Sequence, residues 1–257
     1  MSPTDASCCC SVEMAQLLEQ LAAAMRAKAG KDFPVPPPDT PQVLYSLVTD
    51  DGGAVVSTPA TPIGNDPDGS RRADWRKTDD AKHKPPAYPV DETDDQKPKV
   101  NDTTANCHGT TFGGGGFYID INSVGKILLD NYLKVNIAAG QKARVCDVIV
   151  WGGGPKHSAL VVEVGDDGKP SMVIGKNGDL GRLWAHPPDD YGTDWEVYGR
   201  RNGFDGATQK EIDDLKSAYK KAKDDSDADP KDEAKRKKAH LAAYALCRRK
   251  NKLKEKP

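Results

Sequence analysis

The chain has few of the residues that build a large hydrophobic core. Of its 257 residues, 37% are hydrophobic and 6% aromatic, whereas 30% are charged, and 24 glycines and 19 prolines interrupt the sequence. Apolar side chains in this proportion cannot supply a dense core along the full length. We therefore expect one packed domain with weakly structured flanks.

Long apolar runs are also lacking. No window approaches the roughly 18 consecutive apolar residues that a membrane-spanning helix needs, so we predict no membrane span. The first ten residues have neither the basic start nor the apolar centre of a secretory signal. The default localisation is therefore cytoplasmic, with specialised secretion as the alternative. A net charge of −2 argues against nucleic-acid binding.

The six cysteines form neither a disulfide framework nor a CxxC zinc pair. We interpret Cys146 as a core strand residue and expect a reducing compartment. The adjacent residues Cys8 to Cys10 are either a frayed terminus or a site of palmitoylation or soft-metal binding.

Composition and apolar spacing divide the chain into four parts. Apolar residues recur at three- and four-residue steps between Ser11 and Lys28, which predicts an amphipathic helix. The stretch from Thr208 to Pro257 contains 16 Lys and Arg against 10 Asp and Glu and predicts two charged helices separated at Asp229-Pro230. We expect that hairpin to be solvated, or to dock on an acidic partner. The parts are 1–33, the amphipathic helix; 34–99, a Pro-rich segment, hairpin and linker; 100–203, the catalytic domain; and 204–257, the basic helical tail.

Local patterns predict the elements between residues 43 and 200. A linker or long surface loop is expected from Thr58 to Lys99, with Trp75 as the one residue large enough to dock it. A helix capped by Asn122 or Ser123 should bury Val124, Ile127, Leu128 and Leu133. The expected strands are Val43 to Val48, Ala54 to Val56 after a tight turn, Phe117 to Ile119, Cys146 to Trp151, Ser158 to Val164, Met172 to Ile174 and Trp195 to Tyr198.

Thiol chemistry is the strongest chemical signal. Cys107 stands at a turn-to-helix junction, where unpaired amides and the helix dipole favour a thiolate and can hold an oxyanion. Asn106 could aim its amide at the same oxyanion. His157, opening an apolar strand, is a better general base than His108, since adjacent helical side chains diverge by about 100°. We expect His157 to meet the sulfur across the helix–sheet interface.

A third residue should hold the imidazole in the required tautomer. Asn177, on the loop after the next strand, is the first choice, with Glu163 and Asp147 in reserve.

These segments carry a family resemblance. Asn106-Cys107-His108-Gly109, Asp147 to Trp151, His157 to Val164 and the later Asn177 resemble the CHAP and NlpC-like branch of papain-like cysteine amidases and peptidases. The resemblance covers roughly residues 101 to 198. It implies an α+β fold, with a short Cys-bearing helix packed on an antiparallel sheet and helical extensions at both ends. It also implies amide hydrolysis, with peptidoglycan peptides as the suggested substrate.

The predicted site has a second group of residues and several rivals. Asn106, His108, Trp151 and His186 form the substrate or oxyanion group, although His186 could instead belong to a structural turn. Cys107, His108 and His157 lack a fourth ligand for zinc, so we predict no metal and no cofactor. Cys107 could also be an inert buried thiol. The rival functions are an inactive binding module, with a protein partner on its terminal helices, and a Cys/His deamidase or transglutaminase-like enzyme.

Overall fold

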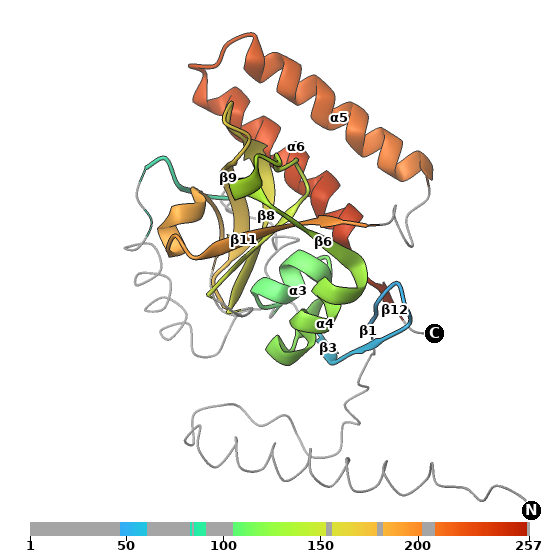
Figure 1. Ribbon diagram of the computed structural model, residues 1–257. Coiled ribbons are helices and arrows are strands. Elements are labelled where there is room, and N and C mark those ends of the chain that lie inside the picture. Colours follow the sequence, from blue (N-terminus) through green and yellow to red (C-terminus); the bar gives the residue numbers. More distant parts are fainter. Residues whose placement is uncertain are drawn as a thin grey trace, which may run out of the picture. The chain divides into compact units, whose positions relative to one another are not determined.

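The computed structural model describes residues 47–60, 83, 85–90, 105–152, 156–178, 182–201 and 209–255 (Figure 1). All of these belong to one compact unit, which begins at Val43. The predicted helix between Ser11 and Lys28, the Cys8 to Cys10 run and Trp75 lie outside the described residues.

A seven-stranded antiparallel sheet is the centre of this unit, in the order β4-β10-β9-β8-β7-β11-β6. The predicted α+β class is therefore confirmed. The near-continuous apolar runs of β7 and β8 form neighbouring strands buried on both faces, as expected. The strands are β4 (Tyr88–Pro89), β6 (Tyr132–Val135), β7 (Val148–Trp151), β8 (His157–Val164), β9 (Pro170–Lys176), β10 (Leu183–His186) and β11 (Trp195–Arg200).

Two small sheets adjoin the large one. The predicted hairpin is confirmed, because β1 (Leu47–Val48) pairs with β2 (Ala54–Val55) across a turn in which Gly52 has a positive φ of 80°. The other side of β1 pairs with β12 (Lys254–Glu255). β3 (Ser57–Pro59) pairs with β5 (Phe117–Ile119), so the start of the predicted linker belongs to the fold.

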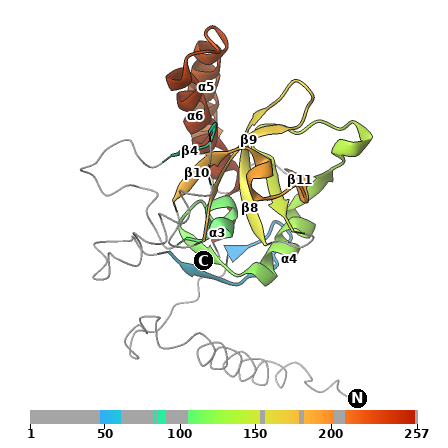
Figure 2. The same ribbon diagram turned by 90° about the vertical axis from the view of Figure 1, so that its left-hand side faces the viewer.

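Two helices cover one face of the large sheet. α3 (Cys107–Phe112) and α6 (Glu233–Asn251) both pack against β8, and Phe112, Leu160 and Leu246 share one core (Figure 2). The opposite face carries a second cluster, Ile149, Trp151, Ala159, Val161 and Val173, packed against the 3-10 turn η2 (Pro188–Tyr191). Because side chains alternate along a strand, β8 directs Ser158 toward α3 and His157 toward η2.

α6 corrects the prediction that the C-terminal hairpin is solvated. α5 (Gln209–Asp227) and α6 form the two predicted helices and lie side by side (Figure 1). However, α6 buries Ala243, Tyr244 and Cys247 in the fold. Its C-cap region continues into Leu253, whose N–H donates to the carbonyl of Phe112 at the end of α3.

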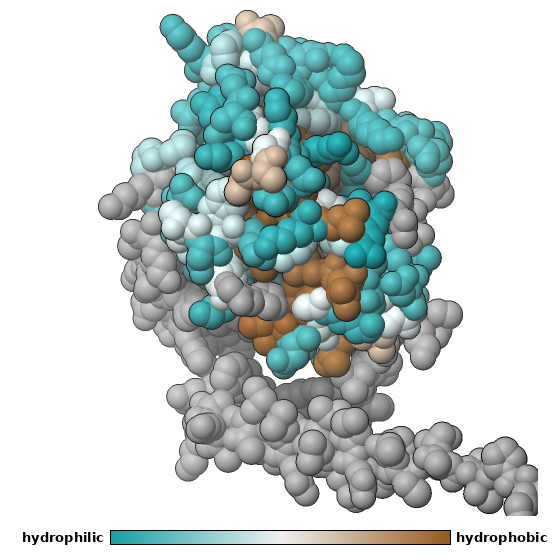
Figure 3. All heavy atoms as spheres, in the orientation of Figure 1, coloured by the Kyte–Doolittle hydropathy of each residue, from teal (hydrophilic) through white to brown (hydrophobic). Residues whose placement is uncertain are grey.

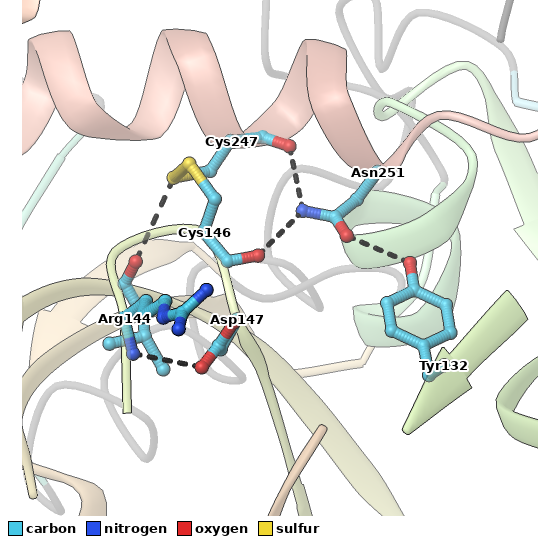
Figure 4. Close-up of a disulfide and its surroundings, with 7 residues drawn as sticks. Tyr132, Arg144, Cys146, Asp147, Cys247 and Asn251 are labelled. Atoms are coloured by element: carbon cyan, nitrogen blue, oxygen red, sulfur yellow. Dashed lines mark hydrogen bonds between the residues drawn. A yellow bond between two sulfur atoms is a disulfide. The ribbon is translucent and has the colours of Figure 1, made fainter. Parts of the chain in front are cut away.

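A disulfide between Cys146 and Cys247 joins α6 to the loop before β7 (Figure 4). It corrects the interpretation of Cys146 as an unpaired strand residue; that residue precedes the strand, with a φ of +78°. Asn251 supports the junction, because its Nδ2 donates to the carbonyls of both cysteines and its Oδ1 accepts from Tyr132. The two cysteines are 101 residues apart in sequence, so this bond closes most of the described chain into one loop.

α4 (Ile121–Asn131) begins before the expected cap. Asp120 is the N-cap and accepts from the Asn122 amide, while Val124 and Ile127 are buried as predicted. Leu133 is a correction: it lies in β6 and is 58% exposed. Apolar side chains also show at the surface near α4 and β6 (Figure 3). The exposed large apolar residues are Val56, Tyr118, Ile121, Leu129 and Leu133.

Candidate active site

The short helix α3 begins at the predicted residue because Asn106 caps it. Asn106 Oδ1 accepts from the amides of Gly109 (2.8 Å) and Ile119 (3.2 Å), and its Nδ2 donates to the Ile119 carbonyl (2.8 Å). A β-carbon on Gly109 would lie 1.6 Å from the Phe117 carbonyl oxygen, so only glycine permits this approach of helix and strand. Asn106 therefore joins α3 to β5, and its amide is directed at β5 rather than at an oxyanion.

Two opposing influences act on the thiol of Cys107. Hydrogen bonding by the backbone of Ser158, His108 and Cys107 itself lowers its pKa. Burial has the larger effect, because Cys107 is only 6% exposed, and it raises the pKa of the thiol to about 11. The thiol is therefore protonated at neutral pH. Cys107 is a free cysteine.

His108 is held between α3 and β8. Its Nδ1 lies 2.9 Å from Ser158 Oγ, and that hydroxyl donates to Thr111 Oγ1 at 3.1 Å. Because the single hydroxyl proton of Ser158 goes to Thr111, Nδ1 of His108 carries the proton that the hydroxyl accepts. His108 is 2% exposed. This geometry gives it a positioning role in place of the predicted substrate contact.

His157 is the first residue of β8, and its ring lies on the face opposite α3. It stacks on Tyr191 with ring centroids 4.4 Å apart and also contacts Trp151 at 5.1 Å. Nε2 is buried and has no hydrogen-bond partner among the residues that the structure describes. Burial, followed by the nearby His186, lowers the imidazole pKa to about 3. The expected meeting across the helix–sheet interface is replaced by a backbone contact, because the amide that follows His157 donates to the Cys107 sulfur.

The register of the sheet bears on the predicted third residue. Where β8 pairs with β9, Leu160 lies opposite Ile174. The same register, continued toward the start of β8, places Asn177 opposite His157. The reserves lie elsewhere: Glu163 contacts His240 Nε2 at 2.7 Å, and Asp147 accepts from the Arg144 amide at 2.8 Å. Six residues of strand separate Glu163 from His157, a distance of about 20 Å. Asn177 therefore stays a prediction, and the reserves are too remote.

Trp151 and His186 lie beside His157 in a buried cluster of rings. The Trp151 indole donates to the Pro188 carbonyl at 3.0 Å, and His186 Nδ1 donates to the Pro187 carbonyl at 2.8 Å. His186 ends β10, is fully buried, and has an unpartnered Nε2; burial lowers its pKa to about 3. Both residues contact η2 and pack around the imidazole, so in this structure they do not face solvent where a substrate would approach.

Sequence reasoning missed two members of this cluster. Tyr191 was left without a role, and His83 fell inside the predicted linker. His83 stacks on Trp184 with centroids 4.2 Å apart, and its Nδ1 lies 3.4 Å from Asp190 Oδ2. A lone histidine in a polar segment gives no local signal for such a contact. The only signal was the unexplained concentration of aromatic and histidine residues between Leu183 and Tyr191.

Within the part of the chain that the structure describes, no three His, Cys, Asp or Glu side chains are grouped as a metal site would require. Over the same residues, no helix is both long and apolar enough to cross a bilayer. The chain matches no protein-family model, no curated protein and no solved structure. The function must therefore be argued from the geometry and the sequence motifs alone.

Proposed function

We propose that the protein is a cysteine-dependent amide hydrolase with a papain-like core, in which Cys107 is the nucleophile and His157 the general base. The observation that carries the proposal is the position of the sulfur at the first residue of α3, where hydrogen bonding by backbone groups, Ser158 foremost, favours the thiolate. Backbone amides in such a position stabilise the negative charge that develops during acyl transfer. One of these groups belongs to Ser158, the residue that directly follows the proposed base, His157.

The protonation states favour general-base catalysis over a preformed ion pair. The pKa of Cys107 is raised to about 11 and that of His157 is lowered to about 3, so both groups are neutral between those values. As the sulfur attacks the carbonyl carbon, the thiol proton passes to His157 and then to the leaving amine. Water afterwards cleaves the thioester. His157 is the first residue of β8, and catalytic hydrogen bonds often tighten only when substrate binds.

The proposed substrate is a peptide amide, and the resemblance suggests peptidoglycan peptides. The Cys146–Cys247 disulfide supports action in an oxidising compartment, because disulfides persist there and are reduced in the cytosol. This replaces the cytoplasmic default, which rested on the first residues and the cysteine spacing.

Mass spectrometry of peptidoglycan peptides after incubation with the full chain tests the proposal. We expect new fragments with the wild type, none with Cys107→Ala, and at least about a 100-fold slower reaction with His157→Gln, because general bases contribute on that scale. His240→Gln is the matched control, since His240 lies on α6 and contacts Glu163. A product about one dalton heavier without chain cleavage would indicate the deamidase alternative. Unchanged cleavage by Cys107→Ala would refute cysteine catalysis.

The burial of Cys107 favours a second candidate, the inactive binding module. A thiol that is 6% exposed with a raised pKa has the properties of a structural cysteine. This candidate predicts that peptidoglycan peptides bind without being cut, and that Cys107→Ala binds them as tightly as the wild type.

A further inference from the structure

The turn that ends in Tyr191 is anchored by a side-chain contact at each of the four residues before it. Three of the anchors are side-chain hydrogen bonds from the sheet, and they fix both the backbone and the acidic side chains of η2. The contacts are His186 Nδ1 to the Pro187 carbonyl, Trp151 Nε1 to the Pro188 carbonyl, Trp195 Nε1 to Asp189 Oδ1 (2.8 Å) and His83 Nδ1 to Asp190 Oδ2 (3.4 Å). The turn is thus held as a rigid platform, and its final residue is placed by four preceding contacts.

Tyr191 presents its ring to His157 from this platform. The two ring planes are 23° from parallel, with centroids 4.4 Å apart. The hydroxyl of Tyr191 lies 3.4 Å from Nε2 of His83, and the ring of His186 contacts the Tyr191 ring at 4.9 Å. The phenol ring is therefore held by His186 at its edge and by His83 at its hydroxyl, while the anchored turn places its backbone. One face of the ring covers the His157 imidazole.

The other side of the imidazole is bounded by backbone. A β-carbon on Gly175 would lie 3.4 Å from Nε2 of His157, so the ring packs against the β9 backbone at that glycine. Nε2 itself has no hydrogen-bond partner. Packing between Tyr191, Trp151 and Gly175 thus orients this end of the ring, where the triad pattern would use a hydrogen bond.

We propose that Tyr191 is a positioning residue for the His157 imidazole and that His83 in turn fixes the Tyr191 hydroxyl. This inference rests on the proposed function, in which His157 is the base. Tyr191 acts by restricting the rotamer of the ring and by excluding water from it, and it does not touch the substrate. The sequence assigned the orientation of the His157 imidazole to a polar residue, Asn177. In this proposal the ring of Tyr191, from the turn η2, shares that role.

The test combines nuclear magnetic resonance titration of the imidazoles with steady-state kinetics. The variants are Tyr191→Leu, which removes the ring, and Tyr191→Phe, which keeps the ring and removes the hydroxyl. Tyr198→Leu is the matched control, since that ring lies on β11 and its hydroxyl donates to Glu196. The His157 resonance is assigned by its loss in His157→Gln. The titratable groups whose charge acts on His157 are His186, His108 and His83, with Asp190 beside His83 and His108 on the other face of the sheet.

We expect His157 to stay neutral down to about pH 3 in the wild type, Tyr191→Phe and Tyr198→Leu, and to titrate at least one pH unit higher in Tyr191→Leu. kcat should fall about 10- to 100-fold in Tyr191→Leu with KM nearly unchanged, because misplacing a catalytic group by about 1 Å has an effect of this size. Tyr191→Phe should restore most of kcat.

Unchanged titration and kcat in folded Tyr191→Leu would overturn the inference. If that variant does not fold, Tyr191→Met takes its place, because the flexible methionine side chain adapts to irregular gaps in a core while still removing the ring. If the wild type hydrolyses nothing, the proposed function fails, but the titration still decides whether Tyr191 controls the environment of His157.

Discussion

The backbone N–H of Ser158 donates a hydrogen bond to the sulfur of Cys107. The side-chain hydroxyl of Ser158 accepts a hydrogen bond from His108 Nδ1. One residue of β8 therefore contacts the first two residues of α3. Because the contact to sulfur comes from the backbone, a change of the Ser158 side chain leaves it intact.

Cys107 should react slowly with alkylating agents in the folded protein. Its pKa is raised to about 11 from the usual value of 9, so at pH 8 the thiolate population is about 100-fold smaller than in the unfolded chain. We expect alkylation, followed by peptide mass mapping, to accelerate as pH rises toward 11. Rapid alkylation at pH 6 that disappears in His157→Ala would instead demonstrate an activated thiolate and contradict the raised pKa.

Acid should destabilise the fold through two buried histidines. His157 and His186 have pKa values lowered to about 3, so their contribution to stability is complete above the unfolded value of about 6.5 and is lost as pH falls toward 3. Two additional protons bound by the unfolded state reduce the free energy of unfolding by up to about 2.7 kcal/mol per pH unit. Urea titrations across this range measure the slope.

Asp147 requires a control in that experiment. Burial raises its pKa to about 6, so its contribution has the opposite sign between the unfolded value of 3.8 and pH 6. The slope is best measured in Asp147→Asn, whose amide oxygen can still accept from the Arg144 amide. Adding His186→Gln should then halve the slope; an unchanged slope would show that His186 does not titrate as described.

Reduction of the Cys146–Cys247 disulfide should lower stability without unfolding the sheet. A cross-link spanning 101 residues restricts the unfolded chain by about 4 to 5 kcal/mol in the loop-entropy model, and strain in the folded state reduces that figure. Denaturation with and without reductant measures the loss. The double variant Cys146→Ser/Cys247→Ser should be insensitive to reductant, whereas Cys107→Ser should respond like the wild type. Equal stability of reduced and oxidised protein would contradict this account.

Two glycine substitutions should have opposite effects. Gly109→Ala places a β-carbon 1.6 Å from the Phe117 carbonyl oxygen and should destabilise the protein by at least about 2 kcal/mol. Gly125→Ala, in α4, meets no atom within 4 Å and should stabilise it by about 0.5 to 1 kcal/mol. Thermal unfolding of the two variants compares them directly. A tolerated Gly109→Ala would mean that α3 and β5 are less closely packed than the structure shows.

The sequence was most informative where the signal is local. The apolar runs of β7 and β8, the turn before β2 and the helix start at Cys107 all depend on neighbouring residues, and the structure contains each of them. β4 and β10 were missed because they are short and acquire strand geometry only by pairing with each other and with β9. The disulfide was missed because its cysteines are joined by the fold and not by spacing.

The site was predicted in part for the same reason. The amides at the start of α3 follow from the local sequence, but the burial that outweighs them for Cys107 depends on strands far along the chain. Strand alternation decides which side chain of β8 meets α3: Ser158 faces the helix and His157 faces the opposite side of the sheet. An apolar run alone does not show which of its alternate residues face the helix, because that depends on how the strand pairs with its neighbours.

The contact between Leu253 and Phe112 has a consequence for synthesis. The Cys107-bearing helix ends on a carbonyl that is satisfied by a residue made 141 positions later, and β12 closes the sheet that begins with β1. A ribosome must therefore release almost all of the described chain before α3 acquires its final neighbours. The surroundings of Cys107 are therefore completed only after Leu253 has been synthesised and released.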